Sequence, residues 1–275
     1  MSDTNSVAPI AVGGIGGSGT RVIAALLLAC GVYMGSDLNE ALDNLWFTFL
    51  FKRRRVLLEG HAEFDELLSL LVRKMSSGVG PSPAELGRLS ALANFSRIDH
   101  GPNWLRARLD SLCRPSRTCD GVWGWKEPNT HVVAERILAN HKDIRYVHVS
   151  RHPLDMIQSN NQRQLAFWGP VFLERDIAIG PRDSFSYWCV AEFRARSLSG
   201  KFPGRVHFVN YDRFCSAPAE ESRVLLNALG IEAQPSEAFT QRIENPRDAA
   251  SREHVDLSIF NPTDLEVAAR LGYIL

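Results

Sequence analysis

Gly13-Gly14-Ile15-Gly16-Gly17-Ser18-Gly19-Thr20-Arg21 is the most informative segment of this 275-residue chain. Apolar residues 9–12 precede it and apolar residues 22–28 follow it, which predicts a buried strand, a glycine turn and a helix. Glycines accept positive φ angles and let successive backbone N–H groups point into one concavity. The helix start adds unpaired N–H donors and a positive dipole end, so the segment predicts a site for an anion such as phosphate.

The spacing of Gly14 and Gly19 is similar to that of a Walker A loop, which requires Lys and then Ser or Thr after the second glycine. Thr20 and Arg21 stand there instead, so the phosphate-binding lysine and the hydroxyl that holds Mg²⁺ are both missing. Gly14, Gly16 and Gly19 also match a dinucleotide-binding pattern, but no acidic residue closes a second strand about 20 residues later. The loop predicts a phosphate ligand without identifying the chemistry.

Composition narrows the class of protein. The chain has 31 Lys and Arg against 31 Asp and Glu, and this balance argues against nucleic-acid binding through bulk electrostatics. Five scattered cysteines without zinc-type spacing indicate reduced thiols and no metal site. The first eight residues do not resemble a signal peptide, and the longest apolar stretch, residues 45–51, is too short to span a bilayer. We therefore expect a cytoplasmic protein.

Strand and helix patterns alternate through the second half of the chain. Strands are expected at residues 122–126, 144–150 and 205–211, and helices at residues 131–139, 154–165, 183–199 and 218–229. This rhythm predicts an α/β fold: a three-layer parallel sheet with helices on both faces, similar to P-loop NTPases. We expect a single domain over residues 1–275, with ligands at the carboxyl ends of the strands.

Residues 40–118 interrupt this alternation with helical patterns only, at residues 61–75, 83–95 and 103–113. We interpret them as a helical insertion and expect it to bind the acceptor of the reaction. Before it, residues 32–35 fit a short strand, and Ser36 or Asp37 fits a helix N-cap.

The aromatic residues 45–51 run directly into the basic residues 52–55 and allow two interpretations. The first is a buried helix that ends in a solvated basic turn. The second is the aromatic wall and cationic rim of an acceptor pocket.

Two further turns carry polar residues at the ends of predicted strands. Lys126, Glu127 and Pro128 form one of them, and Arg151 closes the strand that precedes the other. Ser159 follows eight residues after Arg151, so a cation and a hydroxyl can reach one phosphate group. Each residue also has a structural alternative, as a surface ion pair, a helix-packing residue or a snorkelling side chain.

With these motifs the sequence resembles the PAPS-dependent sulfotransferases, which use 3′-phosphoadenosine 5′-phosphosulfate, and in motif it is closest to their tyrosylprotein-type and bacterial branch. Residues 17–21 stand where that family has a phosphosulfate loop reading roughly Lys/Arg-Ser-Gly-Thr-Thr. Arg151 and Ser159 match its 3′-phosphate motif, and residues 126–128 are similar to its Lys-Asp-Pro turn. Tyr211 begins a segment that looks like the family's Tyr-Glu-x-Leu.

The resemblance covers residues 8–37 and 122–230 in the family's order. It implies in-line transfer of a sulfuryl group from PAPS to a hydroxyl or amine of a small-molecule, carbohydrate or peptide acceptor, leaving PAP. It assigns the nucleotide to nine residues: Gly16, Gly17, Ser18, Gly19, Thr20, Arg21, Arg151, Ser159 and Tyr211.

One position departs from the family, because Gly17 stands where the loop cation is normally found. Arg21, Lys126 or loop amides would have to take over its charge. In the C-terminal tail, Arg247 or Arg252 is expected to fold over the nucleotide, as basic C-terminal segments do in the family.

The resemblance assigns Lys126 to stabilising charge on the bridging oxygen, and an acceptor needs a general base. Asp37 falls at the family's glutamate position by distance from the loop, unless it caps a helix. Glu127 is a second candidate, unless it holds Lys126 in place. His61 is a third, unless it only begins a helix.

Two other functions are compatible with the loop. One is a P-loop kinase or NTPase with a degenerate Walker sequence. The other is a non-catalytic protein that binds a nucleotide, which the loss of the loop cation at Gly17 would favour.

Overall fold

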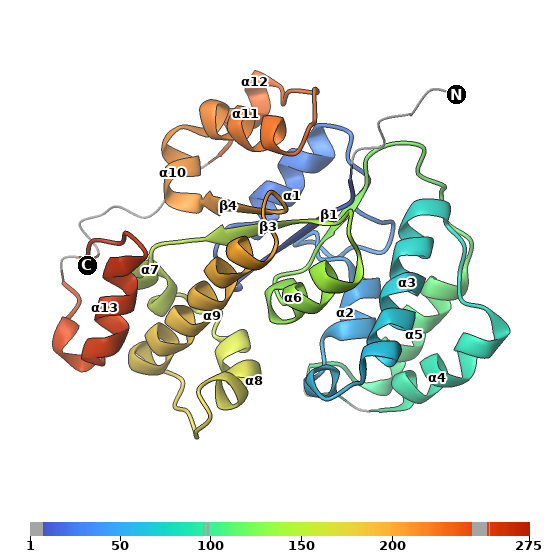
Figure 1. Cartoon of the computed structure of the whole chain (residues 1–275), viewed down its shortest axis with the longest axis horizontal. Coiled ribbons are helices and arrows are strands. Elements are labelled where there is room, and N and C mark those ends of the chain that lie inside the picture. The colour runs from blue at the N-terminus through green and yellow to red at the C-terminus, as the bar shows by residue number, and fades with distance from the viewer. Residues whose placement is uncertain (1–7, 96, 98, 244–251, 253) are drawn as a thin grey trace.

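Four parallel strands in the order β2-β1-β3-β4 form the centre of the structure (Figure 1). The structure is a computed structural model that describes residues 8–95, 97, 99–243, 252 and 254–275. The strands are β1 (Ile10–Gly14), β2 (Gly124–Lys126), β3 (Arg145–Ser150) and β4 (Val206–Asn210). In register, Gly14 lies beside Val149, so the loop after β1 meets the residues that follow β3.

Helices cover both faces of the sheet, as the alternation of strands and helices predicts (Figure 1). On one face, Val12 and Val147 pack against α1 (Thr20–Ala29) and α11 (Pro218–Ala228). On the other, Trp125 joins the core formed with α6 (Thr130–Asn140) and α9 (Pro181–Lys201). Strand residues alternate between the two cores because successive side chains point to opposite faces of a sheet. The three-layer α/β prediction is confirmed.

Residues 40–118 form helices and no strand in their described part, as expected. They comprise α2 (Leu45–Phe51), the 3₁₀ turn η1 (Arg54–Leu57), α3 (His61–Ser77), α4 (Pro83–Asn94) and α5 (Pro102–Cys113). Helices α3, α4 and α5 gather at the right of Figure 1. Helix α2 begins at the carboxyl end of β2, where the Asn44 N–H donates to the Lys126 carbonyl over 2.7 Å. The insertion thus starts at a strand end that carries a predicted site residue.

The remaining helices lie after β3 and β4. They are α7 (Pro153–Ile157), α8 (Arg163–Phe172), α10 (Tyr211–Ser216), α12 (Glu237–Thr240), the 3₁₀ turn η3 (Leu257–Ile259) and α13 (Pro262–Arg270). Helix α13 packs on α9, so the described C-terminal residues return to the sheet near the end of β3.

Three local predictions were wrong. The expected helix over residues 154–165 is two helices, because Gln162 donates to the carbonyls of Met156 and Ser159 and so competes with the helical hydrogen bonds. No strand spans residues 32–35, where only Tyr33 forms a single bridge, to Trp123. No helix begins at residues 36–37, because the helix N-cap is Asn44, whose side chain accepts from the Phe47 N–H.

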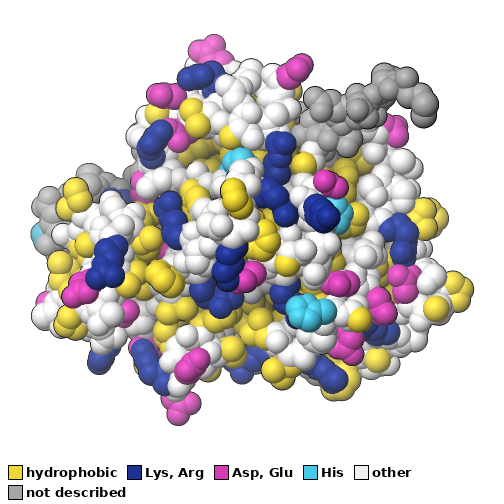
Figure 2. Space-filling view, in the orientation of Figure 1, with side chains coloured by type: hydrophobic (Ala, Val, Ile, Leu, Met, Phe, Trp, Pro, Cys, Tyr) yellow, Lys and Arg dark blue, Asp and Glu magenta, His cyan; other side chains and the backbone are white. Residues whose placement is uncertain are grey.

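Positive and negative side chains are interspersed over the face shown in Figure 2, in keeping with the zero net charge. All five cysteines are free thiols. Among the described helices, none combines the length and the apolar character needed to cross a bilayer.

Candidate functional site

Two side chains from other elements, Tyr211 and Ser159, pack against the glycine loop between β1 and α1. Gly17 and Gly19 have φ angles of 100° and 95°, in the region that favours glycine. A Cβ on Gly19 would overlap the ring of Tyr211, and one on Gly17 would lie 3.2 Å from the Ser159 Oγ. The loop glycines therefore allow a tight turn and also let these two side chains approach the backbone closely.

Arg151 leaves the end of β3 toward this loop. Its Nη1 donates to the Gly17 carbonyl over 3.4 Å, and its guanidinium lies 5.5 Å from the centre of the Tyr211 ring. Burial raises the pKa of the Tyr211 hydroxyl to about 12, against the nearby positive charges of Arg151 and Arg21. The structure thus brings together four of the residues predicted to bind nucleotide: Gly17, Arg21, Arg151 and Tyr211.

Ser159 lies beside the loop but not on a helix, which differs from the expectation. Helix α7 ends at Ile157, and the Ser159 Oγ accepts from the Asn161 N–H over 3.2 Å. On α8, the Gln164 Oε1 accepts from the Gly16 N–H over 3.2 Å. The short α7 and the bend after it place a hydroxyl and two amide side chains against the loop. Asn161 and Gln164 were not predicted, because no spacing rule links them to a loop so distant in the sequence; Gln164 follows Gly16 by 148 positions.

The interior of the loop holds an unused polar group. The Ser18 side chain is buried, and its Oγ has no hydrogen-bond partner among the described residues. A buried hydroxyl without a partner costs stability. Together with the loop amides, it fits an anionic group.

Lys126 lies at the end of β2, with its side chain only 2 % exposed. Its Nζ donates to the Ala41 carbonyl over 2.9 Å and forms a short ion pair with Asp43. Asp43 precedes α2 and was not predicted, since distance from the loop marks Asp37 and no sequence pattern marks Asp43.

Glu127 does not hold Lys126, and this alternative is wrong. Its two carboxylate oxygens accept from the backbone N–H and the side-chain amide of Asn129, whose Oδ1 in turn accepts from the Trp168 Nε1. Burial raises the pKa of Glu127 to about 7, against the opposing charge of Lys52. Glu127 therefore stabilises the turn into α6.

Asp37 lies in the segment before α2 and caps no helix. Its Oδ1 accepts from the Arg108 Nη1 over 2.9 Å, while its Oδ2 is buried without a partner among the described residues. A carboxylate held by one oxygen keeps the other available to a proton. His61 is exposed and begins α3, as one of its two interpretations expected.

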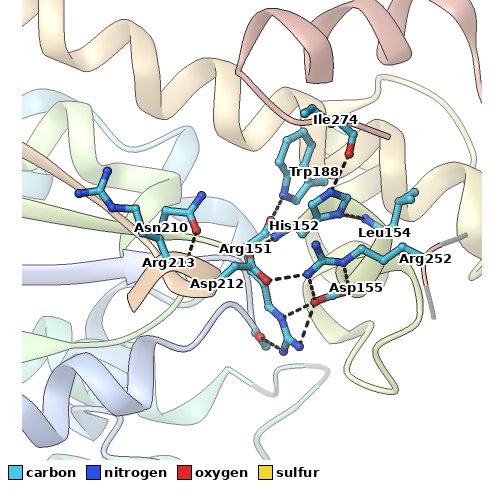
Figure 3. Close-up of polar contacts among 11 residues, drawn as sticks. Arg151, His152, Leu154, Asp155, Trp188, Asn210, Asp212, Arg213, Arg252 and Ile274 are labelled. Atoms are coloured by element: carbon cyan, nitrogen blue, oxygen red, sulfur yellow. Dashed lines mark hydrogen bonds and ion pairs between the residues drawn. The ribbon is translucent and has the colours of Figure 1, made fainter. Parts of the chain in front are cut away.

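Figure 3 shows a charged cluster behind Arg151. Asp155 pairs with Arg151 over 3.2 Å and with Arg252 over 2.9 Å, and Arg252 also reaches Asp212 over 2.8 Å. Burial alone would raise the pKa of Asp155, but the hydrogen bonds and charge of Arg252 and the charge of Arg151 outweigh it and lower that pKa. Arg252 thus contacts Asp155, the carboxylate that pairs with Arg151, whereas Arg247 lies outside the described residues.

The C-terminal residues fasten the same strand end. The Ile274 carbonyl lies 3.0 Å from the His152 Nε2, and the Trp188 Nε1 donates to the Arg151 carbonyl (Figure 3). The Tyr273 hydroxyl donates to Ser150 Oγ over 3.2 Å. Helix α9 and the C-terminal residues thereby contact Arg151 and the residues on either side of it.

A parallel α/β sheet with a glycine loop before its first helix defines a class of proteins that bind phosphate-bearing ligands at that loop. A family model described as "Sulfotransferase family" matches residues 9–235. Because this match covers most of the chain, the protein belongs to the sulfotransferase family. Sulfuryl transfer is its reaction class, and the family generally uses PAPS as donor.

Sulfotransferases of solved structure are similar to this chain. The sulfotransferase domain from the Synechococcus PCC 7002 olefin synthase is similar with a TM-score of 0.51 at 16% identity, covering 100% of this chain and 98% of that chain. A sulfotransferase from Alicyclobacillus acidocaldarius has a TM-score of 0.47 at 14% identity, covering 98% of this chain and 97% of that chain. No curated protein matches the sequence.

The Arg252 contacts predict an acid-sensitive contribution to stability. We expect Arg252→Ala to lower the free energy of unfolding at pH 7 by about 1.5–3 kcal/mol, the worth of hydrogen bonds to charged groups. Because the pKa of folded Asp155 is below its usual 3.8, this contribution is present above that value and lost as pH falls below it. Urea unfolding at pH 7 and pH 2.5 measures the difference, with the exposed Arg270→Ala as control. An equal loss at both pH values would contradict the prediction.

The raised pKa of Glu127 predicts that its contribution to the free energy of unfolding changes with pH in the opposite direction. Since the folded-state pKa of about 7 lies above the usual 4.5, its contribution is fully present below pH 4.5 and is lost as pH rises to 7. We expect the free energy of unfolding of Glu127→Gln, relative to the wild type, to rise across this interval. Urea unfolding at half-unit steps measures it, and Glu135→Gln on the exposed side of α6 serves as control. A difference that does not change with pH would rule out the raised pKa.

Proposed function

We propose that the protein transfers a sulfuryl group from PAPS to a hydroxyl or amine, with the glycine loop and the end of β3 holding the nucleotide. The contact that supports this most directly joins Arg151 to the Gly17 carbonyl, with Ser159 at the same loop position. The Arg151 guanidinium and the Ser159 hydroxyl, which both follow β3, therefore lie at the glycine turn that also presents the loop amides. That arrangement suits a ligand with two anionic groups, such as the 3′-phosphate and the 5′-phosphosulfate of PAPS.

The nucleotide would be held by groups of two kinds. Loop amides, the unpartnered Ser18 hydroxyl and Thr20 suit the 5′ side, where the helix dipole of α1 also favours negative charge. Arg151 and Ser159 suit the 3′-phosphate through charge-assisted hydrogen bonds. The Tyr211 ring, packed on Gly19, keeps the loop in this conformation.

When bound, PAPS supplies an activated sulfuryl group on a phosphate leaving group. Lys126 would stabilise the negative charge that develops on the leaving group, and Asp43 orients its ammonium. Arg21, exposed on the first turn of α1, would supply positive charge that Gly17 lacks.

Asp37 would take the proton from the acceptor. Arg108 fixes one carboxylate oxygen, and the second has no partner in the described part of the chain. In contrast, Glu127 has both oxygens engaged by Asn129. We therefore assign proton transfer to Asp37 and a supporting role to Glu127.

Arg151→Ala tests the nucleotide site. We expect PAP binding to weaken by about 1.5–3 kcal/mol, or roughly 10- to 150-fold, because a charge-assisted hydrogen bond is lost. Isothermal titration with PAP measures the change. Arg145→Ala, at the amino end of the same strand, is the matched control and should bind PAP as the wild type does. Unchanged affinity in Arg151→Ala would refute the 3′-phosphate assignment.

Asp37→Asn tests the proposed base. The amide retains an oxygen for Arg108 but cannot take a proton, so we expect kcat to fall about 100-fold while PAP affinity is kept. The measurement is sulfate transfer from PAPS across a panel of phenol, alcohol and amine acceptors. His61→Ala should retain activity. Normal turnover in Asp37→Asn with loss in Glu127→Gln would transfer the role to Glu127.

A further inference from the structure

The aromatic residues 45–51 do not line a pocket, since every residue of α2 is buried in the core. The basic turn after them is not simply solvated either. Arg53 is buried, and its guanidinium forms two hydrogen bonds with Glu59, at 2.6 and 2.9 Å. Both sequence interpretations were therefore partly wrong, and the basic turn has a different neighbourhood.

Three arginines of this turn line a cavity of about 500 Å³, a size typical of small-molecule sites. Its walls come from the turn, the start of α3, the end of α4 and α8. The lining residues are Arg53, Arg54, Arg55, Glu59, Glu63, Arg88, Ala91, Leu92, Phe95, Arg97 and Phe167.

The cavity carries an excess of positive charge. Glu59 neutralises Arg53, and Arg88 pairs with Glu66 over 2.7 Å. No ion pair involves Arg54, Arg55 or Arg97 in the described part of the chain, and only Glu63 opposes them from the lining.

Arg54 and Arg97 are held in place by neutral groups. The Arg54 Nε donates to the Phe167 carbonyl over 2.7 Å, and the Arg97 Nη2 donates to the Phe49 carbonyl over 2.7 Å. Burial, together with the charge of Arg53, lowers the pKa of Arg97 to about 10, which leaves it charged at neutral pH. The Arg55 side chain is exposed and makes no hydrogen bond with any described residue. An anion would find fixed positive charge here with little rearrangement.

The remaining lining is apolar. Phe95 is 65% exposed at the end of α4. The Arg54 guanidinium lies over Phe167, with its Cζ 5.3 Å from the centre of the phenyl ring. Leu92 adds aliphatic surface. A ligand with an apolar body and an anionic group would match both features, because large exposed apolar side chains gain from burial and arginines from an anionic partner.

Two walls of the cavity adjoin the proposed reaction centre. Lys52 directly precedes Arg53, and its positive charge acts on Glu127 at the end of β2. On α8, Phe167 lies three residues, about 4.5 Å of helix rise, after Gln164, which contacts the loop at Gly16. A molecule in the cavity is thus within one helical turn of a residue that touches the glycine loop.

We propose that this cavity binds the acceptor and selects an amphipathic anion, an apolar molecule that carries a carboxylate, sulfonate or phosphate besides its reacting hydroxyl or amine. Arg55 and Arg97 would recognise the anionic group, and Phe95 and Phe167 the apolar body. This inference rests on the proposed sulfotransferase function for the acceptor role, but the selectivity of the cavity can be measured without it.

Binding is tested with two fluorescent probes that share one ring system. 8-Anilinonaphthalene-1-sulfonate is anionic, and N-phenyl-1-naphthylamine lacks the sulfonate. We expect the anionic probe to bind at one site about tenfold more tightly, and Arg55→Glu to weaken it about tenfold without affecting the neutral probe. Arg55→Lys keeps the charge and should bind nearly as the wild type does. Arg223→Glu, exposed on α11, is the control, and thermal unfolding verifies that each variant is folded.

The acceptor role is tested with PAPS and a second matched pair, 6-hydroxy-2-naphthoate and 2-naphthol. We expect the anion to have a KM about tenfold lower, and Arg55→Glu to raise that KM with little change in kcat. Equal binding of the two probes, or equal KM values for the two acceptors, would overturn the inference while leaving sulfuryl transfer intact. Absence of transfer to any acceptor, with probe selectivity retained, would contradict the proposed function instead.

Discussion

The register of β1 against β3 is the constraint on which the rest of the site depends. With Gly14 beside Val149, the loop after one strand and Arg151 after the other leave the sheet at the same level. Arg151 then reaches the Gly17 carbonyl, and Tyr211, one strand further, packs on Gly19. A shift of one residue would reverse which side chains face each core, so the buried faces of the sheet also fix the site.

Charged groups at this edge are held by partners from distant segments. Asp155 lies between Arg151 and Arg252, and Lys126 between the Ala41 carbonyl and Asp43. A buried charge without a partner is costly, so each pair limits the rotamers available to the cation. The desolvation cost of these cations is offset because their orientation is fixed. A fixed orientation suits groups that stabilise charge developing during a reaction.

The helical insertion contributes to both the reaction centre and the cavity beside it. The segment that leads into it supplies Asp37, its own first residues supply Asp43, and the turn after α2 supplies the arginines of the cavity. The insertion is anchored to the sheet where the Asn44 N–H donates to the Lys126 carbonyl. A single connection between β1 and β2 thus carries elements that the proposed function assigns to proton transfer and to acceptor selection.

The sequence by itself determined the layered α/β fold, the glycine loop and the arginine after β3, because strand and helix periodicity and strained glycine turns are local properties. It also pointed to sulfuryl transfer through the order of its motifs, which the family match confirms. Only the tertiary structure decided that Ser159 follows a helix break, that Asp43 rather than Glu127 holds Lys126, and that the arginines line a cavity with Phe95 and Phe167. These depend on contacts between segments far apart in the chain, where partners are chosen by packing and charge rather than by spacing.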